Sequence, residues 1–269
     1  MNNKMRTLSG LSIFTAFLLA WPLTAVAQVS KGPGPSEGQA WTVPDLNLEM
    51  VCIGPGTFTM GSDNGADDQK PQTRVTLTHG FWLGKTEVTQ GQWVALMGIN
   101  PSSFKGTDLP VEQVSWSDAI EFCRKLTNRE RTARRLPEDY EYTLPTEAQW
   151  EYACRAGTTE DNAGNLDATA WYHHNSDATT HPVGQKQANA WGLYDMHGNV
   201  WEWCLDWYGN YPGGSVRDPI GPASGSKQVY RGGGMFSSAQ RCRSGFRGWN
   251  VPGGRSPDLG FRLALSSVP

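Results

Sequence analysis

The sequence has little charge and lacks the signatures of several common enzyme classes. Lys, Arg, Asp and Glu make up 18% of the 269 residues, and the formal net charge is −3. This balance provides no basic surface for nucleic acid or for anionic membranes. The sequence also has no GxSxG, HExxH, P-loop or dinucleotide-binding glycine motif. Nothing in it therefore indicates a hydrolase or a nucleotide-binding protein.

Cysteine is scarce and irregularly spaced. No two of the five cysteines form a CxxC pair, which gives no support to a zinc ribbon or a thioredoxin-type site. An odd number leaves at least one thiol without a partner inside the chain. The five are Cys52, Cys123, Cys154, Cys204 and Cys242.

Long apolar runs are absent after the N-terminus. Lys4 and Arg6 precede an apolar stretch over residues 11–25, and Ala25-Val26-Ala27 has the small residues of a cleavage site. The stretch is shorter than a membrane span, and polar sequence follows it at once. We therefore expect residues 1–27 to be a signal peptide cleaved near Ala27. The mature chain would then be periplasmic or secreted, with no membrane span; a retained signal anchor is the alternative.

Glycine and tryptophan are abundant, with 31 and 12 residues respectively. Many glycines and aromatic residues, with few long periodic segments, indicate a loop-rich chain folded around aromatic side chains. Residues 28–47 are rich in Gly, Pro and Ser and are expected to be a flexible lead-in. Residues 48–266 contain no internal repeat and are expected to form one domain.

Short strands and three helices are predicted within this domain. Gly54-Pro55-Gly56 lies between two apolar runs and predicts a hairpin. The helical signal disappears after residue 158, where short apolar pieces alternate with Gly, Pro and Asn. The expected class is α+β, with helices early and loop-linked strands late. The predicted helices begin after a Ser or Thr N-cap, and these caps are Thr89, Ser115 or Ser117, and Thr146.

A series of motifs in one order resembles the formylglycine-generating-enzyme (sulfatase-modifying factor) family. The resemblance covers about residues 48–265 and implies a decorated C-type-lectin-like α+β fold with little regular secondary structure. The stretches that carry it are IGPGTFTMGS (53–62), FWLGKTEVTQGQW (81–93), PVEQVSWSDAIEFC (110–123), LPTEAQWEYACRAG (144–157), HPVGQKQANAWGLYDMHGNVWEW (181–203), YRGGG (230–234), RCRSGFR (241–247) and LGFRLA (259–264).

The resemblance also implies a structural calcium ion. Calcium takes six to eight hard oxygen ligands, and two carboxylates would balance its charge. The alternative is that Glu202 pairs with an arginine and Asp195 caps a turn. A second family site would fall near Asn165 and Leu166, although its later ligands have no match. The implied ligands of the first site are the side chains of Asp195 and Glu202 and the carbonyls of Gly198 and Val200.

The catalytic site of the family does not carry over. The enzyme oxidises a substrate cysteine with two thiols that bind copper, but Ser237 stands where the first thiol is expected and no cysteine occupies the second position. Copper(I) needs soft thiolate ligands, so copper binding and formylglycine generation are not expected. Gly234 replaces a pocket serine and Asp258 an asparagine. The candidate pocket residues are Trp201, Ser237, Ser238, Arg243 and Asp258.

Several other residues have two interpretations. The resemblance implies a disulfide between Cys154 and Cys242, and two separate buried thiols are the alternative. Arginines such as Arg243 can simply tie loop carbonyls and carboxylates together. His173 and His174 are adjacent, so in a strand they point to opposite faces and do not share a metal ion.

Three functions stay open for an exported member of this family. The first is an accessory protein that binds a protein, peptide or small-molecule ligand. The second is an oxidoreductase-like maturation enzyme with altered chemistry, like the family members that take part in siderophore-pigment maturation. If the thiol assignment is wrong, its chemistry would be formylglycine generation. The third is a variable binding protein of a diversity-generating retroelement, with variation over residues 234–258.

Overall fold

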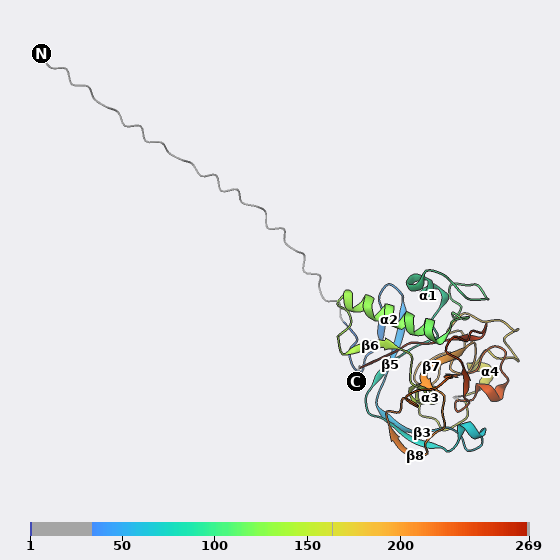
Figure 1. Cartoon of the computed structure of the whole chain (residues 1–269). Coiled ribbons are helices and arrows are strands. Elements are labelled where there is room, and N and C mark those ends of the chain that lie inside the picture. The colour runs from blue at the N-terminus through green and yellow to red at the C-terminus, as the bar shows by residue number, and fades with distance from the viewer. Residues whose placement is uncertain (2–33, 163, 268–269) are drawn as a thin grey trace. The chain divides into compact units, whose positions relative to one another are not determined.

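The computed structural model describes residues 1, 34–162 and 164–267 of the chain. The predicted signal peptide after Met1 and residues 28–33 of the predicted lead-in lie outside these residues and stay predictions. In the described ranges, no helix has both the length and the apolar character needed to cross a bilayer. Figure 1 shows the folded part, in which α2 and β3 lie at opposite ends.

Three capped helices are present where the sequence predicts them. At each start, a Ser or Thr hydroxyl accepts from the N–H of the third helical residue, whose side chain accepts from the N–H of the cap. These reciprocal bonds satisfy amides that a helix start leaves unpaired. The caps are Thr89, Ser115 and Thr146, and the helices are α1 (Gln90–Met97), α2 (Trp116–Thr132) and α3 (Glu147–Arg155), with a short α4 (Leu166–Thr169) after them.

The strands form three small sheets. The first has the order β1-β2-β5-β12-β6, the second β10-β9-β7-β11 and the third β3-β4-β8. Most pairs are antiparallel, but β11 runs parallel to β7 and β8 parallel to β4. The bounds are β1 Trp41–Val43, β2 Leu48–Ile53, β3 Gly56–Met60, β4 Thr73–Leu77, β5 Phe81–Gly84, β6 Tyr140–Thr143, β7 Trp201–Trp207, β8 Gly214–Arg217, β9 Gln228–Arg231, β10 Gly248–Asn250, β11 Leu259–Gly260 and β12 Ala264–Ser267.

The predicted hairpin around residues 54–56 is wrong. β2 pairs with β1 and β5, whereas β3 pairs with β4 in a different sheet. The turn residues therefore carry the chain from one sheet to the next instead of folding it back on itself. Apolar alternation identified both strands correctly, but their partners are decided by contacts with distant segments.

The fold begins earlier than predicted, inside residues 28–47, which the sequence predicts to be a flexible lead-in. Trp41 and Val43 of β1 are buried, and the Trp41 indole N–H donates to the Tyr142 hydroxyl at 2.8 Å. Burial of a tryptophan with a partner for its N–H stabilises the edge of the first sheet. This contact with a distant residue stabilises the strand. The Gly- and Pro-rich sequence around it gives no local signal for a strand.

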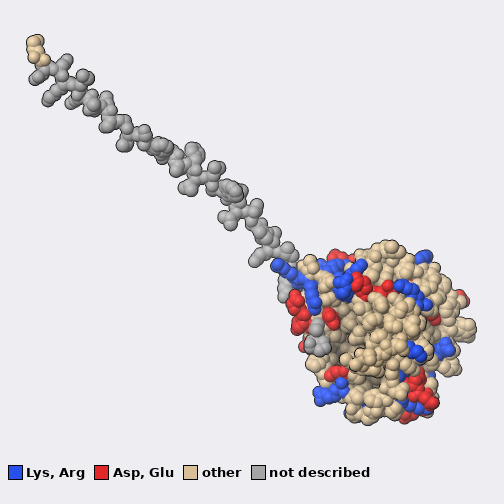
Figure 2. Space-filling model, in the orientation of Figure 1, with Lys and Arg blue, Asp and Glu red and all other residues tan. Residues whose placement is uncertain are grey.

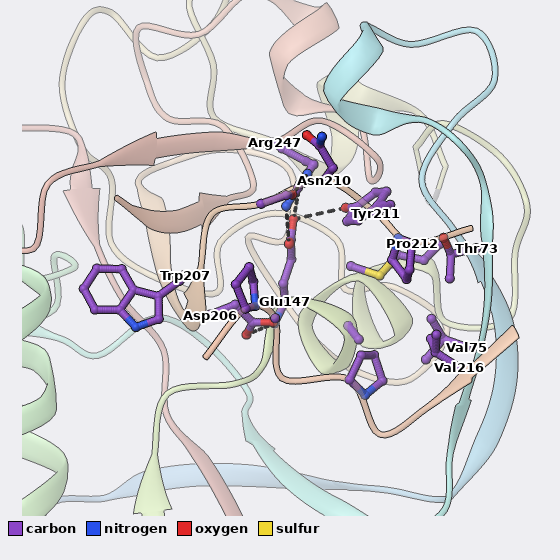
Figure 3. A pocket seen from close by; sticks show the side chains of 16 residues that line it. Thr73, Val75, Glu147, Asp206, Trp207, Asn210, Tyr211, Pro212, Val216 and Arg247 are labelled. Carbon is purple, nitrogen blue, oxygen red and sulfur yellow. Dashed lines mark hydrogen bonds and ion pairs between the residues drawn. The ribbon is translucent and has the colours of Figure 1, made fainter. Parts of the chain in front are cut away.

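A buried group of ion pairs joins α3 to the C-terminal strands. The Glu147 carboxylate accepts from Arg247 Nε at 2.6 Å and from Arg231 Nη1 at 3.0 Å. Glu151, one turn later, pairs with Arg231 and with Arg155. Figure 3 shows Glu147 pointing toward Arg247 and Tyr211. Arg247 is therefore a structural residue, as one interpretation of such arginines predicted: it bonds to Glu147 and to the carbonyls of Asp68 and Gly209.

A small cavity of about 60 Å³ lies beside this group. Asp206 is at its border, where its carboxylate accepts from the Glu147 N–H at 2.7 Å (Figure 3). Burial and the negative charge of Glu147 raise the pKa of Asp206 to about 8. The space is large enough for one or two water molecules.

Replacing Glu147 with glutamine is expected to destabilise the fold by about 3–5 kcal/mol, since it leaves Arg231 and Arg247 buried with too little negative charge. The free energy of unfolding in urea measures the loss. Glu121→Gln is the matched control, because Glu121 pairs with Arg124 on the surface of α2. Equal unfolding midpoints for the two variants would contradict a stabilising role for the buried group.

Candidate ligand-binding cleft and cation site

The pocket candidates from the sequence, called the candidate cleft below, meet where the loop after β9 reaches the start of β7 and the residue before β11. Trp201 and Gly234 are buried there, and Asp258 is half-buried. An ideal Cβ on Gly234 would lie 3.2 Å from Trp201 Cδ1 and 3.2 Å from Asp258 Cβ. The parallel pairing of β7 with β11 places these two residues together, and the Trp201 N–H donates to the Asp258 carbonyl at 2.7 Å. Three of the segments that the sequence singles out thus meet, and they pack closely because residue 234 has no side chain.

Ser237 lies in a tight turn at the edge of this cleft. Its hydroxyl accepts from the Gly234 N–H at 3.0 Å, and its own N–H donates to the Gly234 carbonyl at 2.8 Å. The side chain is buried, whereas that of Ser238 is exposed beside it. The serine at the expected thiol position therefore has a structural bond that fixes the turn.

Arg243 does not join the cleft residues. Its guanidinium donates to the Gln240 carbonyl at 3.0 Å and to Gln69 Oε1 at 3.1 Å, and it lies 3.5 Å from Asp161. These contacts tie η2 (Ala239–Cys242) to two distant loops. The structural interpretation of this arginine is the one that the geometry supports.

Two aromatic residues of the cleft were missed by the sequence analysis. The Trp201 ring lies 4.9 Å from the Tyr230 ring and 5.9 Å from the Phe246 ring, measured between centroids. Both residues belong to motifs that served only to identify the family resemblance. β9 pairs with β7 so that Tyr230 lies opposite Trp203, and this pairing between distant segments brings Tyr230 to Trp201.

Glu112 is a further residue that the sequence analysis passed over. It is buried, and one oxygen accepts from the Phe104 N–H at 2.9 Å, while Oε2 has no partner among the residues described. Burial raises the pKa of Glu112 to about 7, and the charge of Asp258 adds to the rise. A glutamate between the buried Val111 and Val114 was a visible signal, since a buried carboxylate needs a specific reason.

Asn199 holds the neighbouring loops in place. It adopts a left-handed conformation with φ 64°, its N–H donates to the Trp171 carbonyl, and its carbonyl accepts from the Met235 N–H. Its side-chain oxygen accepts from the His181 N–H at 3.0 Å. The segment after Trp171 therefore packs on the loop that carries Ser237.

The histidines of that segment serve packing. The His181 ring stacks on Trp171 at 3.7 Å between centroids. The N–H of His173 donates to the Ser237 carbonyl. In the part of the chain that the structure describes, no three His, Cys, Asp or Glu side chains group in a way that could hold a metal ion. A cation site here would depend on backbone carbonyls as well as on side chains.

Glu202 pairs with Arg262, whereas the resemblance implied that it is a calcium ligand. Its two oxygens accept from Arg262 at 2.6 and 2.7 Å, and its Oε2 also accepts from the Trp150 indole at 2.7 Å. Arg262 further donates to the carbonyls of Gly84 and Tyr194. The alternative interpretation, in which Glu202 pairs with an arginine, is therefore what the structure shows.

Asp195 and Glu87 form the part of this region that could hold a cation. Asp195 Oδ2 accepts from the Gly184 N–H at 2.7 Å, but its Oδ1 and both Glu87 oxygens are buried without a hydrogen-bond donor among the described residues. Burial and the charge of Asp195 raise the pKa of Glu87 well above its usual value. Adjacent buried carboxyl groups without donors need a proton or a metal ion between them. The oxygen ligands fit calcium.

Asn165 and Leu166 are used differently. Asn165 is the N-cap of α4, where its side-chain oxygen accepts from the Asp167 N–H at 2.9 Å. Its carbonyl accepts from the Thr169 hydroxyl at 3.0 Å. Both Asn165 oxygens therefore accept hydrogen bonds within the helix.

The predicted disulfide is not formed in the structure, in which Cys154 and Cys242 are free and buried thiols. Cys154 Sγ lies 3.8 Å from His197 Nε2, and His197 Nδ1 lies 2.8 Å from the Cys242 carbonyl. Burial raises the pKa of both thiols to about 12 and lowers that of His197 to about 4. This neutral environment matches the alternative of two separate buried thiols.

Comparison with known proteins gives the family. The sulfatase-modifying factor enzyme 1-like domain matches residues 39–267. The chaperone protein LppX of Paenibacillus barcinonensis is 32% identical over 265 residues, which cover 81% of this chain and 89% of that protein.

Two solved structures share the fold. Treponema denticola variable protein 1 has a TM-score of 0.77 and 35% identity, covering 84% of this chain and 98% of its own. PvdO from Pseudomonas aeruginosa has a TM-score of 0.75 and 26% identity, covering 86% of this chain and 99% of its own. The α+β class and the lectin-like fold predicted from the sequence are thereby confirmed. Because the family domain spans nearly all of the described residues, this chain belongs to the formylglycine-generating-enzyme (sulfatase-modifying factor) family.

Proposed function

We propose that this protein is an exported accessory member of its family that binds a ligand or partner in the cleft at Trp201, Gly234 and Asp258, without copper-dependent cysteine oxidation. The observation that carries the proposal is that residue 237, the expected position of the first thiol, is a hydrogen-bonded serine. It is a serine whose hydroxyl is held by the Gly234 N–H, so it offers no thiolate for copper. Cys242, the nearest cysteine in the sequence, is buried and has its pKa raised to about 12.

The chemistry of the cleft favours a ligand with both apolar surface and hydrogen-bond donors. Trp201, Tyr230 and Phe246 provide an aromatic wall. The half-buried Asp258 accepts from the Ser256 hydroxyl through one oxygen. Its carboxylate supplies a negative charge beside that wall. A peptide, a protein loop or a small molecule with an amine or hydroxyl group matches this combination.

An oxidative maturation enzyme is the second candidate. The similarity to PvdO motivates it, together with the second carboxyl group of Glu112, whose pKa is raised to about 7 near Asp258. A carboxyl group that titrates near neutrality can transfer protons. This candidate predicts turnover of a ligand, whereas the accessory role predicts binding alone.

A variable binding protein is the third candidate. The similarity to Treponema denticola variable protein 1 favours it, and Phe236, Trp249 and Val251 are exposed within residues 234–258. A template repeat of this coding region beside the gene would distinguish it from the other two.

In a thermal-shift screen of amine- and hydroxyl-bearing aromatic compounds, hits on the mature protein are expected to lose their shift in Trp201→Ala, which removes the central ring of the wall. Arg243→Ala is the matched control, because Arg243 belongs to the same segment of the fold but contacts Gln69 and Asp161 instead. Tight copper(I) binding with conversion of a cysteine peptide would instead show an oxidase and overturn the accessory role.

Export is expected to leave a mature N-terminus at Gln28, since signal peptidase cleaves after small residues at −3 and −1. Intact mass of the full chain expressed in a bacterial host and recovered from the exported fraction measures this. Ala27→Arg blocks the −1 position and should retain the leader. A chain that keeps residues 1–27 in wild type would contradict cleavage.

We further propose that calcium binds at Asp195 and Glu87, together with the backbone carbonyls of Gly198 and Val200 that the family resemblance implies. Excess chelator is then expected to lower the melting temperature, because a ligand at 100 times its Kd stabilises the folded state by roughly 2.7 kcal/mol. Asp195→Asn should abolish the effect of calcium on melting. Glu49→Gln, at an exposed carboxylate paired with Lys85, should keep it. An unchanged melting temperature in chelator would rule out the site.

A further inference from the structure

A groove separate from the cleft follows strand β3. Its volume is about 850 Å³, and none of the cleft residues lines it. One side is formed by the consecutive strand residues Thr57, Phe58 and Thr59, and the other by Tyr152, Trp191 and the loop after α3. β3 lies at the end of the folded part opposite α2 (Figure 1).

β3 is an edge strand, because the sheet order is β3-β4-β8. Thr57 lies opposite Thr76 of β4, and the Thr76 carbonyl accepts from the N–H of Asp218 next to β8. The N–H and C=O of one strand residue point to the same side, and antiparallel pairs alternate between bonded and non-bonded. Thr57 is therefore in a non-bonded pair and directs its backbone groups away from β4. The same holds for Thr59, two residues later.

These outward groups are unpaired. Within the described residues, the N–H and C=O of Thr57 and Thr59 have no hydrogen-bond partner. The Thr57 hydroxyl does not bond to these backbone groups, because it bonds across the sheet to the Thr76 hydroxyl at 3.0 Å. Two donor–acceptor pairs spaced two residues apart are the template that an added strand needs.

An aromatic shelf lies beside this edge. The ring centroids of Phe58 and Tyr152 are 5.3 Å apart, and those of Tyr152 and Trp191 are 4.8 Å apart. An ideal Cβ on Gly56 would lie 2.1 Å from the Tyr152 hydroxyl, so the tyrosine lies directly against the strand at this glycine. All three rings are half-buried and can contact alternate side chains of a bound segment.

The rim of the groove is acidic. Asp63, Glu160 and Asp161 are exposed, and of these Asp161 is paired with Arg243, whereas Arg155 is buried in its pair with Glu151. Arg74 is the exposed base among the residues that line the groove. On the face in Figure 2, charges of both signs occur in small mixed groups. The excess of carboxylates favours a basic ligand.

We propose that the β3 edge binds an extended basic segment of a partner polypeptide, which adds a strand to the β3-β4-β8 sheet. The segment bonds to the backbone of Thr57 and Thr59. Its alternate side chains pack on Tyr152 and Trp191, and its Lys or Arg residues face the acidic rim. This binding is independent of the cleft, so either proposal can fail without the other.

The test uses the full chain and an acetylated, amidated heptapeptide of alternating valine and lysine. We expect saturable binding by calorimetry, weakened by salt, and slower amide exchange at Thr57 and Thr59. Thr59→Pro removes one outward N–H without touching the ladder to β4, because edge strands tolerate proline there. Affinity should fall about tenfold, as for the loss of one hydrogen bond. Thr59→Val retains the N–H and should bind like wild type.

Absence of saturable binding, equal affinity for a peptide with glutamate in place of lysine, or equal affinity of Thr59→Pro and Thr59→Val would overturn the proposal. If Thr59→Pro does not fold, a lysine peptide methylated on its backbone nitrogens replaces it, and undiminished binding of that peptide has the same meaning. A concentration-dependent dimer that Thr59→Pro dissociates would assign the edge to a second copy of this chain and equally overturn it.

Discussion

Buried guanidinium groups connect the parts of this fold that no sheet joins. Arg262 bonds to Glu202 of β7 and to the carbonyls of Gly84 and Tyr194, so one side chain links three segments far apart in the sequence. Arg231 and Arg247 do the same around Glu147. In a chain with short strands and long loops, these bonds satisfy carbonyls that regular structure would otherwise pair. The arrangement is specific because a charge of this kind cannot stay buried without its partners.

The cleft depends on this framework. Trp201 precedes Glu202, whose position is fixed by Arg262 and Trp150. The pairing of β7 with β11 then places Asp258 beside the ring, and Gly234 completes the space between them. The serine at position 237 is part of the same turn. The scaffold around these residues therefore does not rely on the two thiols of the family's enzymes.

The two proposed binding surfaces differ in their physical basis. The cleft offers side chains, namely an aromatic wall and a carboxylate, and so selects a ligand by shape and charge. The β3 edge offers backbone groups from Thr57 and Thr59, and so selects an extended conformation first and a basic composition second. An accessory protein that uses both could hold one partner while it presents a ligand to another.

The sequence by itself determined the family, the α+β class and the three helix starts, because capping boxes and ordered motifs are local patterns. Through the family resemblance it named Trp201, Ser237, Ser238, Arg243 and Asp258 as pocket candidates, and of these the structure bonds Trp201 to Asp258 and places Arg243 apart. Tertiary structure alone decided the partners of β2 and β3, the pairing of Glu202 with Arg262, and the free thiols of Cys154 and Cys242. The closeness of Glu87 to Asp195 and the free edge of β3 likewise follow only from the tertiary structure. Strand pairing and buried charge pairing depend on contacts between distant segments, which no local pattern encodes.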